Sequence, residues 1–378
     1  MRIVLVTHNL RVAGGLSVGQ RIVRTLPKIA PEHKYLIIVP SGCGYPVTSE
    51  QSTVQVVECP PMGLLKRMFW ERISLPRIVA SFHPDWIWCL GNYGLRHPEC
   101  RQSLLFHDSH LIYPAAAFGD VSSWYRFKKW LLKRKLRDSL PCISTVYCQT
   151  DIVRQRFYQT FSYPLDKIAF CPGAFSLPKP SVDLPESFNC SSLVNGMFRL
   201  FYVSSCSGHK NHRILLDVFN TYREELSDVV CFLTIDSEEN ARASSFVQEI
   251  RERSLEKQLI PIGHLSADQV ARCYGEMNAL IFPSLLETVG FPLIEAMQFE
   301  LPIIVSDLDF AHEICGSAAE YVDPSSAESI KDGILTLRHN AVRCRELSQF
   351  GKERINTHMK TWPDILRDVL DNENIEHQ

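Results

Sequence analysis

The sequence lacks an apolar run long enough to span a bilayer, a Cys-x-x-Cys pair and any short-period repeat. No stretch of its 378 residues approaches the roughly 20 apolar residues that a membrane helix needs. Residues 1–10 contain only four consecutive apolar residues and no small-residue cleavage site, which predicts a buried strand instead of a signal peptide. The absence of short repeats argues against a solenoid.

The thirteen cysteines are numerous, but they are scattered singly from Cys43 to Cys344. This spacing argues against a zinc ribbon, a redox dithiol and a disulfide framework. We therefore expect small buried thiols in a reducing cytosol.

An excess of one charge is also missing overall, because the formal net charge is −2. The distribution is nevertheless uneven. Residues 1–190 contain 23 Lys and Arg against 13 Asp and Glu, whereas the remainder contains 17 against 29. A basic first half and an acidic second half indicate two structural units with different partners. An anionic ligand or surface should prefer the first half.

Short apolar runs alternate with amphipathic segments along most of the chain, which is typical of parallel sheets covered by helices on both faces. Residues 172–197 interrupt this alternation with Pro, Ser, Gly and Asn and predict a linker. We therefore expect an α/β protein with two Rossmann-like lobes that face each other across a cleft. The expected boundaries are 1–175 for the first lobe, 176–196 for the linker and 197–359 for the second lobe.

One loop of the second half has the residues of an anion-binding site. A strand over residues 279–284 should end at this loop, and Pro292 should lie in the first turn of the next helix. Backbone N–H groups at a helix N-terminus suit a phosphate, and Gly290 permits a positive φ. Glu287 and Glu295 are carboxylates that suit the hydroxyls of a sugar and of a ribose. Taken alone, such a pair is more often a solvated loop residue and a dipole-compensating helix residue.

The segment FPSLLETVGFPLIEAMQFELPIIVSD, residues 282–307, resembles the donor-site signature of retaining GT-B glycosyltransferases of glycosyltransferase family 4, the group 1 glycosyltransferases. Residues 259–284, 309–326 and 11–26 are similar to other parts of the same family's pattern. The resemblance implies a GT-B fold, in which the C-terminal helix, residues 360–378, returns to the first lobe.

The resemblance also implies a binding site for a UDP- or GDP-sugar donor. Lys210 would contact the diphosphate, Glu287 the hydroxyls of the donor sugar and Glu295 the ribose hydroxyls. The complete donor set that it implies is Gly14, Gly15, Ser204, Lys210, Gly263, Glu287, Thr288, Val289, Gly290, Phe291 and Glu295. We recognise no Asp-x-Asp motif that would clamp a metal on the diphosphate, so a metal is not expected, and cations and a helix dipole would replace it.

One departure from the family concerns the phosphate site. Many members have an arginine about six residues before the lysine, and here Ser204 stands at that position. His209 and Arg213 are the candidates that could compensate for the missing cation.

In the first half, the glycines between residues 14 and 19 do not form a Gly-x-Gly-x-x-Gly fingerprint, which argues against an NAD-binding lobe. The resemblance instead implies a Gly14–Gly15 turn whose amides reach the diphosphate. His107 follows a predicted strand and resembles the family's histidine near the reacting carbons, although a lone histidine is as often structural. It joins Lys210 and Glu287 as a catalytic candidate.

Two further residues follow predicted strands of the first half. Asn92 and Asp108 are our candidates for contact with the acceptor.

Residues 124–137 combine aromatic and cationic side chains and predict an amphipathic helix. Arg126, Lys129, Lys133 and Arg137 would form one ridge of that helix. Such a helix suits contact with an anionic membrane surface. It would equally suit nucleic acid, but no nucleic-acid fold accompanies it, and an ordinary core-packing helix with a solvated basic face is the third interpretation.

We therefore expect a retaining glycosyltransferase that moves a hexose-type sugar from a nucleotide-diphosphate sugar to a glycan or lipid-linked acceptor, in polysaccharide or glycolipid biosynthesis. No cofactor, metal or nucleic-acid partner is expected. The expected location is the cytoplasm, with the cytoplasmic face of a membrane as an option. The alternatives are another enzyme of nucleotide sugars, such as an epimerase, and a non-catalytic protein that binds nucleotide sugar or membrane.

Overall fold

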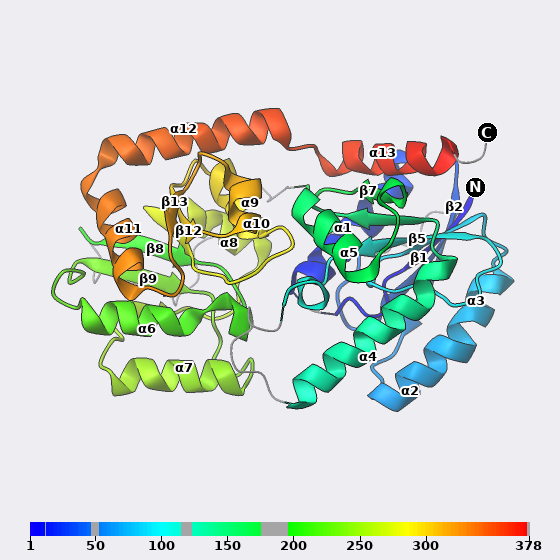
Figure 1. Ribbon diagram of the computed structural model, residues 1–378, viewed down its shortest axis with the longest axis horizontal. Helices are drawn as coiled ribbons and strands as arrows, with labels where there is room; N and C mark the ends of the chain where they lie inside the picture. Colours follow the sequence, from blue (N-terminus) through cyan, green and yellow to red (C-terminus); the bar gives the residue numbers. More distant parts are fainter. Residues whose placement is uncertain (12, 47–52, 115–122, 175–195, 376–378) are drawn as a thin grey trace. The chain divides into compact units, whose positions relative to one another are not determined.

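The computed structural model describes residues 1–11, 13–46, 53–114, 123–174 and 196–375 (Figure 1). These residues form two compact units. The first contains 1–113, 123–174 and 360–375, and the second contains Pro114 and 196–359. Each unit is built on its own parallel sheet, so the predicted α/β class with two Rossmann-like lobes is confirmed.

The first unit contains a seven-stranded sheet in the order β3-β2-β1-β4-β5-β6-β7. Its strands are β1 (Arg2–Val6), β2 (Lys34–Pro40), β3 (Val54–Cys59), β4 (Trp86–Cys89), β5 (Arg101–Phe106), β6 (Thr145–Cys148) and β7 (Ile168–Phe170). Its longer helices are α1 (Ala13–Ile29), α2 (Leu64–Phe69), α3 (Leu75–Ser81), α4 (Ser123–Ser139), α5 (Asp151–Phe161) and α13 (Trp362–Ile375). A π-helix, η1 (Trp70–Ser74), joins α2 to α3, and the 3-10 turns are η2 (Ser109–Leu111), η4 (Leu140–Cys142) and η5 (Leu165–Lys167).

The second unit contains a six-stranded sheet in the order β10-β9-β8-β11-β12-β13. Its strands are β8 (Phe198–Tyr202), β9 (Val229–Leu233), β10 (Leu259–Pro261), β11 (Ala279–Phe282), β12 (Ile303–Ser306) and β13 (Glu320–Val322). Its helices are η8 (Gly208–Lys210), α6 (His212–Thr221), α7 (Ala241–Glu252), α8 (Ala267–Tyr274), α9 (Phe291–Gln298), α10 (Asp309–Cys315), α11 (Ala327–His339) and α12 (Ala341–His358).

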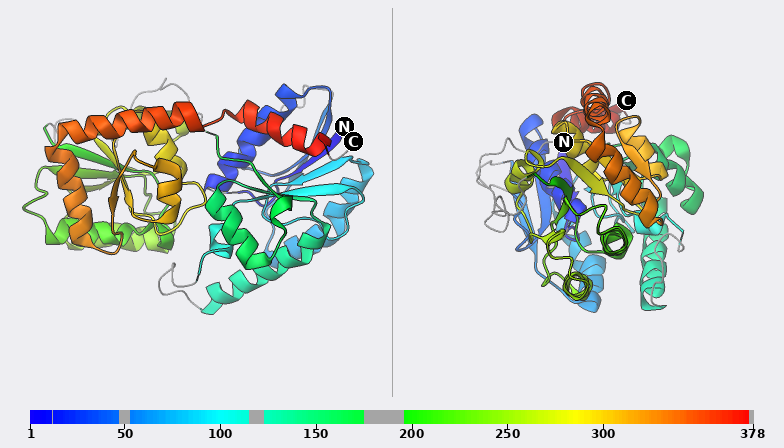
Figure 2. Two further views of the ribbon diagram at one scale, coloured as in Figure 1. Left: turned by 45° about the horizontal axis from the view of Figure 1, so that its top comes forward. Right: turned by 90° about the vertical axis from the view of Figure 1, so that its left-hand side faces the viewer.

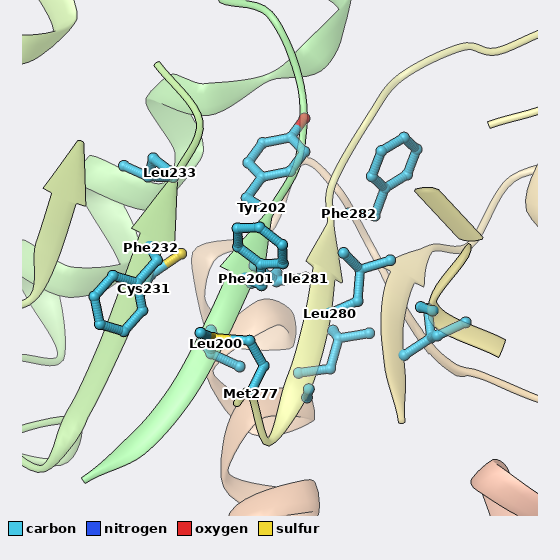
Figure 3. Close-up of a cluster of buried hydrophobic side chains, with 14 of the residues drawn as sticks. Leu200, Phe201, Tyr202, Cys231, Phe232, Leu233, Met277, Leu280, Ile281 and Phe282 are labelled. Atoms are coloured by element: carbon cyan, nitrogen blue, oxygen red, sulfur yellow. The ribbon is translucent and has the colours of Figure 1, made fainter. Parts of the chain in front are cut away.

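Three strands of the second sheet, β9, β11 and β12, are buried along their whole length. In Figure 1, α6 and α7 lie on one side of this sheet, and α9 and α12 lie on the other. Every residue of β9, β11 and β12 is buried, as expected when helices cover both faces of a parallel sheet. Figure 3 shows Phe201, Phe232 and Leu280 of neighbouring strands within this core.

Side-chain caps fix the beginnings of several helices. Thr150 accepts a hydrogen bond from Val153 N ahead of α5. Asn240 caps α7, and Ser266 with Gln269 forms a capping box at α8. Because these caps satisfy amides at the helix N-termini, they define where the loops at the carboxyl ends of the strands stop.

The start of α1 corrects one detail of the sequence prediction. Gly14 and Gly15 were expected in a turn, but α1 begins at Ala13, so both glycines lie in the first turn of this helix. Their backbone amides therefore belong to the positive end of the helix dipole, which keeps them suited to an anion.

The C-terminal helix α13 belongs to the first unit, where it packs against α1 (Figure 2). Glu373 of this helix is fully buried. Its Oε1 accepts hydrogen bonds from Ser103 Oγ at 2.5 Å and Tyr147 Oη at 2.9 Å, and Arg101 lies 3.6 Å from Oε2. One carboxylate thus connects the last helix to β5 and β6.

We expect Glu373→Ala to lower the free energy of unfolding of the first unit by about 3 kcal/mol, because it leaves a buried guanidinium without its counter-charge and two hydroxyls without their acceptor. Urea denaturation would measure the change. Asp371→Ala, at an exposed position of the same helix, is the matched control. Equal destabilisation by both variants would contradict an anchoring role for Glu373.

Candidate active site

The loops that follow β8 and β11 meet at the carboxyl edge of the second sheet. These strands are adjacent, and the order of strands along the chain reverses between them, which is where open α/β sheets bind ligands. A hydrogen bond and a second polar contact connect the loops. Leu285 N donates to His209 O at 2.7 Å, and Ser284 Oγ lies 3.2 Å from the same oxygen.

Lys210 and Glu287 face each other across these two loops. Lys210 Nζ donates to Glu287 Oε1 at 2.5 Å, and Ser284 Oγ donates to the same oxygen at 2.7 Å. Both partners of the ion pair are largely buried, with side chains 15% and 12% exposed. The Lys210 ammonium also lies 5.2 Å from the centre of the Phe282 ring. Lys210, predicted to contact the diphosphate, and Glu287, predicted to contact the donor sugar, are therefore in direct contact.

Gly290 forms the turn into α9. Its φ of 74° and ψ of 61° lie in the left-handed region, which favours glycine. A Cβ here would lie 3.1 Å from Leu293 Cδ1 and 3.6 Å from Glu287 Cγ. The turn thus holds the start of α9, with Phe291 as its first residue, directly beside Glu287. Thr288 is half-buried and Val289 is buried between them.

Glu295 lies just over one turn into α9. Its Oε2 accepts a hydrogen bond from Tyr274 Oη at 3.1 Å. Burial, and then the nearby Glu295 carboxylate, raise the pKa of Tyr274 well above its ordinary value, so the phenol remains a donor. Stacking on Phe299 at 5.4 Å fixes the Tyr274 ring. This tyrosine orients Glu295 and was not singled out from the sequence, because the two residues are 21 positions apart.

Ser204 and His212 form a second buried contact behind the loop after β8. Ser204 Oγ lies 3.0 Å from His212 Nε2, and the imidazole stacks on Tyr202 with centroids 4.6 Å apart. Arg213 bonds Glu249 of α7 at 2.8 Å, so its guanidinium is engaged there. Ser204, which stands where an arginine was expected, therefore supports the loop after β8 through its contact with His212.

Gly263 follows β10, two strands away from β8 in the sheet order. Its φ is 77°, and its N–H donates to Ile235 O at 3.1 Å. It belongs to the same carboxyl edge as Lys210, but the structure does not bring these two residues into direct contact.

The candidates in the first unit gather at the carboxyl edge of their own sheet. His107 N donates to Asn92 Oδ1 at 2.7 Å, and Asn92 has a φ of 67°. A Cβ on Gly15 would lie 3.3 Å from His107 Cε1, so the first turn of α1 lies against the imidazole. Burial lowers the pKa of His107 to about 4, which keeps the ring neutral near pH 7.

Two features of this edge bear on chemistry. His107 Nδ1 is buried without a hydrogen-bond partner among the described residues. Asp108 is used locally, because its carboxylate accepts from His110 N at 3.1 Å, and burial raises its pKa. The neutral imidazole is thus the group with unused hydrogen-bonding capacity, whereas Asn92 and Asp108 already support the loop.

The four cations predicted to form one ridge on α4 are divided by the structure. Arg126 and Arg137 are exposed. Lys129 is turned toward the body of the unit, where Nζ donates to Tyr113 O at 3.0 Å, and burial lowers its pKa to about 8. Lys133 is also half-buried. The prediction of one solvated ridge was therefore wrong for Lys129, because this residue bonds a carbonyl of the same unit.

Metal binding was not expected from the sequence. Within the described residues, no group of three or more His, Cys, Asp and Glu side chains could hold a metal ion. The expectation that the chain has no Asp-x-Asp motif was wrong, because Asp307 and Asp309 form such a sequence directly after β12. Asp307 pairs with His312 at 2.6 Å, and Asp309 accepts from Phe310 N at 2.8 Å. A metal-independent reaction remains a prediction.

One family model matches most of the second unit. Residues 186–354 match the family model described as glycosyl transferases group 1. This segment contains Lys210, Gly263, Glu287, Gly290 and Glu295. The match supports the group 1 assignment for this part of the chain, and family 4 membership stays a prediction.

Two curated relatives have related names. The O-antigen chain mannosyltransferase B of Escherichia coli is 22% identical over 258 residues, which are 67% of this chain and 65% of the relative. The O-antigen chain mannosyltransferase RfbU of Salmonella typhimurium is 33% identical over 92 residues, which are 24% of this chain and 26% of the relative. The chain thus spans less than two thirds of the length of these relatives.

Solved structures match almost the whole chain. Anabaena HepE in complex with UDP and glucose superposes with a TM-score of 0.75, at 15% identity, over 99% of each chain. WaaG, a glycosyltransferase involved in lipopolysaccharide biosynthesis, superposes with a TM-score of 0.71, at 13% identity, over 98% of this chain and 99% of WaaG. At these identities the likeness shows the fold, which is the predicted GT-B fold.

The buried His212 should make the second unit sensitive to acid. Burial, and then Lys210 and Arg242, lower its pKa to about 3. Between pH 6.5 and 3 the unfolded chain binds a proton that the folded unit excludes, so stability falls as the pH decreases. We expect a loss of about 2 kcal/mol by pH 5 from this residue.

Urea denaturation of the wild type and of His212→Gln between pH 7 and pH 4 would measure this effect. The variant should show a flatter dependence on pH, and His264→Gln, at an exposed position of the same unit, should not. Parallel pH profiles of the wild type and His212→Gln would contradict the assignment.

Proposed function

We propose that this chain is a retaining glycosyltransferase of family 4 that transfers a hexose from a nucleotide-diphosphate sugar to a glycan or lipid-linked acceptor. The observation that carries the proposal is the contact of Lys210 with Glu287 beside the Gly290 turn. This contact lies at the switch point of the second sheet, within the residues that match the model of group 1 glycosyl transferases. No cofactor is required for this chemistry.

Lys210 is assigned to the diphosphate. When the bond between the anomeric carbon and the diphosphate oxygen breaks, the leaving group takes the electron pair and gains charge. An ammonium held by neighbouring contacts, together with the N–H groups at the start of α9, would stabilise that charge. This gives the reaction a stabiliser of the leaving group without a metal.

Glu287 and Glu295 are assigned to the two sugars of the donor. Glu287 Oε1 is held by Lys210 and Ser284, which orients the carboxylate for hydroxyls of the transferred sugar. Glu295 is held by Tyr274 through one oxygen, which presents the carboxylate to a ribose diol. We assign no enzyme nucleophile, because Glu287 is already committed to binding.

For the first unit, we propose that His107 faces the reacting groups and that Asn92 and Asp108 shape the acceptor side. A neutral His107 with an unpartnered buried nitrogen can exchange a hydrogen bond with a hydroxyl. The amides at Gly14 and Gly15 are assigned to the diphosphate.

The names of the curated relatives favour a mannosyl donor and an O-antigen type of polysaccharide. The complexes of HepE with UDP and with UDP-glucose leave a uridine donor as the alternative. Among the described residues no helix is both long and apolar enough to cross a membrane. We propose action at the cytoplasmic side of a membrane, on a lipid-linked glycan.

Incubation of the protein with GDP-mannose or UDP-glucose, with and without a lipid-linked oligosaccharide, tests the reaction class. Nucleoside diphosphate released only in the presence of acceptor supports the proposal, and the anomeric configuration of the product tests retention. Conversion of the donor sugar without acceptor would instead indicate an epimerase. Donor binding without turnover would indicate a binding protein.

We expect Lys210→Ala to lower kcat by about 100-fold to 1,000-fold, because one preorganised stabiliser of the leaving group is lost. The change in donor affinity should be smaller. Lys257→Ala, at an exposed position of the same unit, should be as active as the wild type. An unchanged kcat in Lys210→Ala would remove this residue from the mechanism.

Tyr274→Phe tests the placement of Glu295. We expect about a tenfold loss of donor affinity with little change in kcat, since a hydrogen bond to a charged group orients the carboxylate. Isothermal titration with the intact nucleotide sugar and with the free sugar separates the effects. The free sugar should bind equally to both proteins, and an equal loss for both ligands would show a general structural defect instead.

A further inference from the structure

The outward face of α4 exposes large apolar side chains in a row. Trp124, Phe127, Trp130 and Leu131 are 63%, 48%, 53% and 37% exposed. Trp124 and Phe127 have ring centroids 5.9 Å apart, and Phe127 and Trp130 are stacked at 6.0 Å. An exposed aromatic row of this length is uncommon on soluble surfaces and indicates an interaction site.

Four exposed cations accompany the row on the same helix. They are Arg126, Lys128, Arg134 and Arg137. The Arg134 guanidinium lies 5.7 Å from the Trp130 ring, so charge and aromatic surface are combined at one place. The helix contains a single acidic residue, Asp138, and therefore presents a strongly positive face.

Two contacts fix which face of α4 points outward. Lys135 Nζ donates to Glu71 Oε2 at 2.5 Å, and Glu71 also bonds His8 Nε2 at 2.9 Å. Lys129 bonds the carbonyl of Tyr113 on the side of the helix opposite the row. Lys129 on the opposite side of the helix and Lys135 at the edge of the row are thus held by contacts within the unit, so the row stays outward and does not need to rearrange to bind.

We infer that the outward face of α4 docks on an anionic lipid bilayer, with Trp124, Phe127, Trp130 and Leu131 entering the boundary between headgroups and acyl chains. Aromatic rings are stable at that depth, and cations beside them meet the lipid phosphates. The inference revises the predicted ridge, because the aromatic row replaces Lys129 and Lys133 as the contact. It rests on the proposed function, which places a lipid-linked acceptor at a membrane.

The chemistry favours a bilayer over nucleic acid. Nucleic acid would be held by a continuous positive stripe with single rings for stacking on bases. Here the apolar side chains are adjacent, Leu131 offers no stacking surface, and the cations flank the row. That arrangement fits a surface with an apolar interior and an anionic rim.

Flotation of the full chain with vesicles tests the surface without donor or acceptor. We expect binding to vesicles of phosphatidylcholine with phosphatidylglycerol and about tenfold weaker binding to phosphatidylcholine alone. The triple variant W124S/F127S/W130S should lose at least about tenfold in affinity. V342S/F350S, which replaces two exposed apolar residues of α12 in the second unit, should bind as the wild type does.

Quenching of tryptophan fluorescence by brominated lipids adds a direct reading of insertion. The wild type should be quenched, and W124F/W130F should bind vesicles with less quenching. Equal flotation of the wild type and the triple variant, no binding to anionic vesicles, or tighter binding to a single-stranded RNA would each overturn the inference. Thermal unfolding of the triple variant checks that it is folded, and transfer to a water-soluble acceptor tests the proposed function separately.

Discussion

Parallel strands covered by helices on both faces have only their ends available for polar chemistry. In the second unit, β9, β11 and β12 are buried along their whole length, so an unpaired charge cannot be placed within the sheet. The side chains that bind ligands must then come from loops at the carboxyl edge. The loops after β8 and β11 satisfy this constraint, and their mutual hydrogen bonds at His209 turn two separate connections into one surface.

The ion pair of Lys210 with Glu287 follows from that arrangement. Each of these largely buried charges would cost desolvation free energy if it were unpaired, and their pairing lowers that cost. A bound diphosphate would offer the ammonium a second anion at the same place. In the proposed reaction, the pair would hold the lysine in place before the donor binds, and Ser284 would keep the carboxylate in position when the lysine turns to the phosphate.

The sequence was sufficient for the parts of this site that are local in the chain. The Gly290 turn, Pro292 and the two glutamates lie within ten residues, so one loop–helix pattern predicts their position, and the alternation of apolar runs predicts the two sheets. Tyr274 and Ser284 were missed as positioning residues. Tyr274 reaches Glu295 only because β11 returns between them, and such a contact depends on the packing of α8 against α9, which spacing does not reveal.

The helix α4 shows the same limit in another form. Its periodicity identifies which side chains share a face, but the face that turns to the sheet is chosen by contacts from distant segments. The carbonyl of Tyr113 takes up Lys129, which lies opposite the aromatic row, and Glu71 of η1 takes up Lys135 at the edge of the row. The helical periodicity alone cannot predict which of the cationic side chains of α4 point to solvent and which are buried.

The uneven charge of the chain becomes informative only when the positions of individual charged residues are known. The second half is acidic overall, yet the proposed donor is an anion. Net charge acts over distances at which salt screens it, whereas Lys210 and the start of α9 act within contact distance, so the local arrangement decides what binds there. Seven of the 23 Lys and Arg residues of the first half lie on α4. A surface that meets an extended anionic partner benefits from many such cations, and a site that holds one diphosphate needs few.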